Sequence, residues 1–270
     1  MKIVSFNINS IRARPHQIEH LRDTIDPDII GLQETKVNDP DFPIEMINEI
    51  GYHAEYWGQK GHYGVAILSK VKPLNTVKGF IDDSEEDQKR FIQSTHKLGS
   101  QEIVIMNGYF PQGENINHET KFPKKVKFYN DLEKHISEVK KHSKNLIVMG
   151  DFNVSPEDID IGIGEQNAKR WLRDGKTSFQ PQEREMWNKI KDLGFVDTWR
   201  VINQNESSIY SWFDYRSRMF DQDPKRGLRI DHILLSENLK STINKVGIDY
   251  QARAMEKPSD HCPIWLEINE

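Results

Sequence analysis

Short apolar runs with polar residues at their ends recur along the chain. Their length and their content of β-branched residues are typical of strands. The runs occupy residues 3–6, 28–32, 65–68, 103–106, 146–149, 230–235 and 264–268. A short echo between SFNIN at 5–9 and DFNVS at 151–155 is consistent with two similar halves, but chance explains it equally well.

Between some of these runs the spacing of apolar residues changes to that of a helix. One such pattern opens at Pro15, and a longer one has a lysine-rich opposite face. We interpret that lysine-rich face as a solvated surface, with contact to DNA as the alternative. The apolar positions are Ile18, Leu21 and Ile25 in the first pattern and Phe128, Leu132, Ile136 and Val139 in the second. Alternating strands and helices predict an α/β layered architecture.

The segment from 155 to 186 interrupts this rhythm, because few of its apolar positions fall in register. Loops of this length inside compact domains are uncommon and often functional. Its GIGE sequence at 162–165 is reminiscent of a nucleotide-binding loop, but the glycine spacing is incomplete and we expect no helix to open there. The prediction is therefore a turn.

Composition limits the classes of protein that remain. We expect one domain over residues 1–270, and 36% hydrophobic residues suffice for its core. The apolar runs are too short to span a bilayer, and the N-terminal run is too short for a signal peptide. The single Cys262 excludes an intrachain disulfide, favours a cytoplasmic location, and fits packing better than nucleophilic chemistry.

The net charge of −5 argues at face value against nucleic acid as a partner. The distribution of charge matters more than its total, since acidic and basic runs can lie on different faces. Carboxylates that bind a metal ion also make the formal charge too negative, because the ion is not counted. DNA binding therefore stays open.

Polar residues cluster at the ends of the predicted strands, where a core would not place them. Taken singly, each of these residues could have a purely structural role, such as a turn residue or a surface histidine. Strand ends can converge on one rim of a sheet, where α/β folds place ligands. The residues concerned are Asn7, Glu34, Tyr109, Asp151, Asn153, Asp231, Asp260 and His261. Oxygen ligands without cysteine or clustered histidines favour Mg²⁺ or Mn²⁺ over zinc.

Six motifs in order resemble the exonuclease III branch of the endonuclease/exonuclease/phosphatase superfamily, in its bacterial form. They are SFNIN at 5–9, GLQETK at 31–36, GYFP at 108–111, MGDFN at 149–153, GLRID at 227–231 and SDH at 259–261. The resemblance extends from residue 1 to about 266 and includes stretches typical of the branch at 58–66, 160–164 and 211–217.

This resemblance implies a four-layered α/β sandwich, in which two mixed β-sheets pack face to face with helices outside. It also implies a Mg²⁺-dependent (or Mn²⁺-dependent) DNA phosphodiesterase of base-excision repair. Such an enzyme incises duplex DNA 5′ of abasic sites. It also acts as a 3′→5′ exonuclease and as a 3′-phosphatase or 3′-repair diesterase, leaving 3′-hydroxyl ends. A monomer with no membrane partner is expected.

The resemblance also assigns roles to residues. Glu34 would ligate the metal, Asn7 would support it, and Asp260 would approach it through water. Asp151 would take a proton from the attacking water or orient it, and Asn153 would hold that water or a phosphate oxygen. His261, oriented by Asp231, would donate to the phosphate, and Tyr109 would bond the phosphate or aid the leaving group. An abasic pocket would form from Trp212, Phe213 and Leu228, with weaker backbone contacts from Gln112, Lys121 and Arg90.

Two other readings remain at this point. The same catalytic set serves relatives that cleave inositol phosphates, sphingomyelin or nonspecific DNA, although the aromatic pair Trp212 and Phe213 favours the repair branch. A noncatalytic DNA-binding module would ordinarily have lost Asp151, Glu34 or His261, all of which are present.

Overall fold

The computed structural model describes residues 1–269, which form two mixed six-stranded sheets. The first sheet has the strand order β11-β12-β1-β2-β4-β3 and the second β5-β6-β7-β8-β10-β9. The strands of the first sheet are β1 (Lys2–Asn7), β2 (Ile29–Gln33), β3 (His53–Trp57), β4 (Val65–Ser69), β11 (Ile243–Ile248) and β12 (Ile264–Ile268). Those of the second are β5 (Asn75–Lys78), β6 (Phe91–Leu98), β7 (Gln101–Tyr109), β8 (Leu146–Asp151), β9 (Phe195–Asp197) and β10 (Asp231–Ser236).

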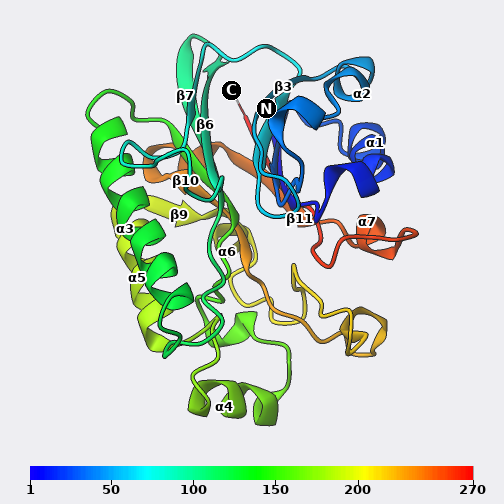
Figure 1. Cartoon of the computed structure of the whole chain (residues 1–270), viewed down its shortest axis with the longest axis vertical. Coiled ribbons are helices and arrows are strands. Elements are labelled where there is room, and N and C mark those ends of the chain that lie inside the picture. Colours follow the sequence, from blue (N-terminus) through cyan, green and yellow to red (C-terminus); the bar gives the residue numbers. More distant parts are fainter. Residues whose placement is uncertain (270) are drawn as a thin grey trace.

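Helices cover the outer face of each sheet (Figure 1). Helices α1 (Pro15–Thr24) and α2 (Ile44–Glu49) pack on the first sheet, and α3 (Lys121–Val139) and α5 (Pro181–Asp192) on the second. The other helices are α4 (Glu165–Arg173), α6 (Thr198–Ile202) and α7 (Tyr250–Ala254), with 3₁₀ turns at Ile11–Ala13, Asp39–Asp41, Asp158–Asp160, Met219–Asp221 and Glu237–Thr242. Within the described residues, no helix has the length and apolar character that a membrane crossing requires.

Three apolar layers hold this arrangement together. Ile18 and Leu21 of α1 pack against the outer face of the first sheet, as their helical spacing predicts. A second cluster, which contains Ile3 and Ile147, lies between the two sheets. A third packs Leu132 of α3 against the second sheet. The four-layered α/β sandwich is therefore confirmed.

The polar strand ends meet because each sheet has a parallel pair at its centre. β1 and β2 run parallel, as do β7 and β8, so Tyr109 lies beside Asp151 in the register. β10 runs antiparallel to β8, which pairs the first residue of β10, Asp231, with the last residue of β8, Asp151. All of these ends lie at one edge of the sandwich.

The strands that periodicity missed are mostly those at the edges of the sheets. β3, β5 and β11 are half-buried or exposed along much of their length, so they lack a continuous apolar run. β6 is buried but contains the polar residues Gln93, Ser94 and His96, so it has no continuous apolar run.

The expectation that residues 162–165 open no helix is wrong. Gly164, with φ 87°, leads directly into α4 at Glu165. This helix buries only Ala168 and Trp171 in part, against a small satellite cluster, and it projects away from the sandwich (Figure 1). Its apolar residues Ala168, Trp171 and Leu172 have helical spacing, but the helix is only 9 residues long, so the pattern did not stand out from the irregular segment around it.

The two halves of the chain share a topology. In chain order, β1 to β4 occupy the positions in the first sheet that β7 to β10 occupy in the second. The echo between SFNIN and DFNVS does not follow this repeat, because these motifs end β1 and β8, and the counterpart of β8 is β2.

Candidate active site

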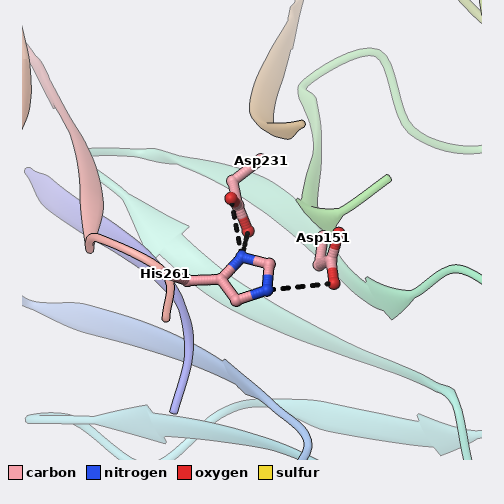
Figure 2. A group of neighbouring side chains, drawn as sticks. All are labelled: Asp151, Asp231 and His261. Atoms are coloured by element: carbon pink, nitrogen blue, oxygen red, sulfur yellow. Dashed lines mark hydrogen bonds and ion pairs between the residues drawn. The ribbon is translucent and has the colours of Figure 1, made fainter. Parts of the chain in front are cut away.

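His261 lies between the carboxylates of Asp231 and Asp151 (Figure 2). All three residues are at the edge of the sandwich where the strands end. Its Nδ1 is 2.9 Å from Oδ2 and 3.0 Å from Oδ1 of Asp231. Its Nε2 faces Oδ2 of Asp151 at 3.8 Å. All three residues are buried. The contact with Asp231 fixes the ring so that Nε2 points toward the cleft and Asp151.

Burial and charge shift these groups in a direction that suits proton transfer. Burial alone would lower the pKa of His261, but Asp231 and Asp151 outweigh it and raise that pKa, so the imidazole is protonated. Burial raises the pKa of Asp151 even though His261 opposes the change, and Asp231 adds to the rise. Asp151 is therefore a stronger base than an exposed aspartate, and it faces a cationic donor.

A second carboxylate lies across one amide from Asp151. Nδ2 of Asn7 donates to Oε1 of Glu34 and to Oδ2 of Asp151, each at 3.0 Å. Burial would raise the pKa of Glu34, but Lys36, whose Nζ is 2.9 Å from Oε2, and the Asn7 amide together lower it. Glu34 stays ionised and has φ 52°, a conformation that non-glycine residues adopt rarely and that clusters at functional sites.

The chemistry of these donors fits a hard divalent cation. Asp151, Asp231 and His261 offer ligand atoms that lie within 4.8 Å of one another. A protonated His261, bound by Asp231, is a poor ligand, and Asp151 is the base, so the ionised carboxylate of Glu34 is the better ligand. Oxygen-rich sets of this kind suit Mg²⁺ or Mn²⁺.

Asp260 contacts the pocket rather than facing these carboxylates directly. Its Oδ1 accepts from Nδ2 of Asn9 at 2.9 Å, and its Oδ2 accepts from Nε1 of Trp212 at 3.1 Å. The bond to Trp212 also sets the orientation of the indole.

The site opens into a cleft of about 460 Å³ that is polar on one side and apolar on the other. Trp212 and Leu228 form the apolar side and are joined by reciprocal backbone bonds of 2.9 and 3.0 Å. The lining residues are Glu34, Tyr109, Gln112, Asp151, Asn153, Trp171, Lys176, Ser178, Trp212, Asp214, Arg216, Met219, Leu228, Ile230, Asp260 and His261.

Asn153 and Tyr109 complete the polar side. Asn153 has φ 53°, its backbone N–H donates to Oδ1 of Asp151 at 3.0 Å, and its Nδ2 donates to the carbonyl of Phe110 at 3.0 Å. Burial and the charge of Glu34 raise the pKa of Tyr109, so its hydroxyl keeps its proton and can donate. Both side chains are thus placed to bond a phosphate oxygen or water.

Three predicted DNA contacts do not line the cleft. Phe213 is 0% exposed and packs behind the wall, against Phe220 and Tyr250. Lys121 pairs with Glu114 on the surface. The Arg90 guanidinium lies over the Tyr63 and Tyr109 rings and donates to the Tyr109 carbonyl at 3.0 Å, a geometry that supports Tyr109.

Residues of the cleft that sequence reasoning did not single out come mainly from two segments. Trp171, Lys176 and Ser178 fall in the stretch 155–186, whose irregularity was the only signal of function. Asp214 and Arg216 lie in the 211–217 stretch, from which only Trp212 and Phe213 were predicted to belong to the site. Nothing in the local pattern indicated that these two segments face one another.

Comparison with known proteins places this site in a family. A model of the Endonuclease/Exonuclease/phosphatase family matches residues 4–261. The chain is 51% identical to Exodeoxyribonuclease III of Haemophilus influenzae over 99% of this chain and 100% of that one. It is 31% identical to Exodeoxyribonuclease of Bacillus subtilis, with 100% of both chains covered.

Solved structures agree with this assignment. A 3′ phosphatase from Neisseria, bound to a product DNA hairpin, matches with a TM-score of 0.91 at 32% identity, covering 100% of both chains. An AP endonuclease from Archaeoglobus fulgidus matches with a TM-score of 0.88 at 34% identity, also over 100% of both chains. The chain belongs to the endonuclease/exonuclease/phosphatase family, in its exonuclease III branch.

Proposed function

We propose that this chain is a Mg²⁺-dependent hydrolase of DNA phosphodiester bonds that incises duplex DNA 5′ of abasic sites. It also removes nucleotides, phosphates and other blocking groups from 3′ ends. The observation that carries the proposal is the buried trio in which a protonated His261, oriented by Asp231, faces the basic carboxylate of Asp151. Two of the three residues, Asp151 and His261, line a cleft with an apolar wall.

The residues divide the chemistry between them. Asp151 accepts a proton from a water molecule, whose oxygen attacks the phosphorus. Asn153 and Tyr109 donate to the water or to phosphate oxygens, and His261 donates to the phosphate as negative charge develops. The bond from phosphorus to the 3′ oxygen breaks, the departing oxygen takes up a proton from water, and the products are a 3′-hydroxyl and a 5′-phosphate.

A divalent cation held by Glu34, with Asn7 beside it, would neutralise charge on the phosphate oxygens. Asp260 would approach the cation through water. Lys36 and Asn7 keep Glu34 ionised, and so ready to bind the cation, at neutral pH.

Selection of abasic sites is assigned to the apolar side of the cleft. A flipped-out sugar without a base would lie against the wall formed by Trp212 and Leu228, with the indole oriented by its bond to Asp260. Phe213 supports the wall from behind. Gln112 in the cleft, and Lys121 and Arg90 nearby, contribute to holding the backbone of the duplex.

We also propose that residues 1–270 act as one domain and as a monomer in the cytoplasm. A continuous apolar layer between the two sheets supports the single domain. The shared cleft edge, built from strands of both sheets, supports it further. Size-exclusion chromatography with light scattering would show a dimer if the monomer is wrong.

The test uses a labelled duplex with one abasic-site analogue beside an intact duplex with a recessed 3′ end. Both are incubated with Mg²⁺ and, separately, with EDTA. Incision at the lesion that requires Mg²⁺ supports the endonuclease, and shortening of the intact strand adds the exonuclease. Binding without cutting in Mg²⁺ would indicate a noncatalytic module, and no action on either duplex would indicate another phosphoester substrate.

A further inference from the structure

A buried ion pair beneath the cleft joins segments that line it. Lys125 of α3 and Glu183 of α5 contact one another, and both side chains are 0% exposed. Nζ of Lys125 also donates to the carbonyl of Asn153 at 2.8 Å and to that of Gln112 at 3.3 Å. An ammonium has three hydrogens to donate, and here each has an acceptor.

Glu183 extends this cluster to a third segment. Its Oε2 accepts from the backbone N–H of Ser178 at 2.8 Å and from that of Gln180 at 2.9 Å. Ser178 lines the same cleft as Asn153 and Gln112, and Gln180 caps α5. One ion pair therefore holds the backbone of Gln112, Asn153 and Ser178.

Stability alone does not account for this pair. Removing two charges from water is costly, and a well-packed apolar pair of similar volume is often equally stable or more so. Asn153 supplies a second reason, because its left-handed φ of 53° must be held by its surroundings. Lys125 binds the carbonyl of this same residue.

We propose that Lys125 and Glu183 are positioning residues for phosphodiester hydrolysis. They fix the backbone at Asn153, Gln112 and Ser178, so that the Asn153 side chain meets the water or phosphate oxygen next to Asp151. This inference rests on the proposed function. Neither residue lines the cleft or touches substrate, so each acts only through the segments that it holds.

Two variants separate positioning from stability. Lys125→Met removes the donor and leaves a buried charge on Glu183, so it lowers both stability and activity. Lys125→Met with Glu183→Gln removes the buried charge, keeps an acceptor for the N–H groups of Ser178 and Gln180, and still lacks the bond to the Asn153 carbonyl. Ile136→Ala, elsewhere in the core packed by α3, is the control for destabilisation alone.

For each protein, kcat and KM on the abasic duplex are measured with Mg²⁺ at a temperature where circular dichroism shows it folded. Thermal melting is measured in parallel. The double variant should melt well above Lys125→Met and yet retain a kcat about 10- to 100-fold below the unmodified chain, with KM changed far less. Ile136→Ala should lose melting temperature and keep its kcat.

Recovery of kcat together with melting temperature in the double variant would reduce the pair to a structural role and overturn the proposal. A fall in kcat for Ile136→Ala equal to that of the double variant would overturn it as well. If the unmodified chain cuts no duplex in Mg²⁺, it is the proposed function that fails instead.

Discussion

At the scale of single residues, the site depends on opposite ionisation of neighbouring groups. His261 and Asp151 share one buried space, yet Asp231 keeps the first cationic and burial makes the second more basic. Separating the pKa values of two groups in this way is how a fold supplies an acid and a base together. The residues that matter most are therefore those whose protonation a neighbour controls.

Asp151→Asn keeps the shape of the side chain but removes the base. We expect kcat on the abasic duplex to fall by at least about 100-fold, with duplex binding in EDTA retained. Single-turnover cleavage and fluorescence anisotropy measure the two effects. Asp249→Asn, at the N-cap of α7, is a matched control that should keep its activity. Full activity in Asp151→Asn would remove this residue from the mechanism.

Trp212→Ala opens the apolar wall of the cleft. We expect incision at an abasic site to fall roughly 10- to 30-fold, more than removal of a 3′-phosphate, because only the first needs the wall to fit a sugar. Trp212→Phe keeps an aromatic ring but loses the donor to Asp260. It therefore distinguishes the effect of the apolar wall from the effect of this hydrogen bond. Equal losses in both activities would instead indicate general destabilisation.

At the scale of elements, strands with one continuous apolar run were predictable and the others were not. The polar residues that end β1, β7 and β8 could be identified from the chain's pattern, because a core excludes them. Helix α4 was missed because its apolar stripe covers only 9 residues and packs on a satellite cluster rather than on the sandwich. Local pattern predicts an element only where burial is one-sided and regular.

Strand β6 is buried but contains polar residues, and one of them, His96, makes the stability of the fold depend on pH. His96 is buried near Ile103 of β7, with Nε2 2.7 Å from Oγ of Ser94. Burial lowers the pKa of His96 from 6.5 to about 4. The folded state therefore excludes a proton that the unfolded chain binds, and this contribution to stability is complete above pH 6.5 and is lost as the pH falls toward 4.

As the pH is lowered from 6.5 to 4, we expect the free energy of unfolding to fall less in His96→Gln than in the unmodified chain. The difference between the two losses should be on the order of 2 kcal/mol. Urea unfolding of both proteins at several pH values measures the difference. His53→Gln, on the exposed end of β3, is the control and should follow the unmodified chain. Parallel curves for His96→Gln and the unmodified chain would contradict the prediction.

At the scale of the whole molecule, total charge misleads about the substrate. The chain has a net charge of −5, yet Lys176 and Arg216 line the cleft. Several acidic side chains of the site lie where a cation would bind. Binding of a polyanion is decided by where the charges lie, and the sum over the surface does not report it.

Arg216→Gln tests this local charge. We expect weaker binding to abasic and intact duplexes alike, and a salt dependence of log K reduced by about one phosphate contact. Anisotropy titrations in EDTA across a series of salt concentrations measure both quantities. Arg22→Gln, on α1, should leave the slope unchanged. A loss confined to the abasic duplex would mean that Arg216 reads the lesion instead.

The local pattern of the chain predicts the layered class, the central strands, and the polar residues that follow them, since buried runs and excluded polar groups are local properties. The ordered motifs also determined the family. The packing of the two sheets, by contrast, brings Glu34 and Asp151 together across Asn7. Packing also places Phe213 behind the wall of the cleft and joins Lys125 to Glu183 in the interior. These contacts join residues far apart in the chain, and their distances depend on how sheets and helices pack rather than on any local pattern.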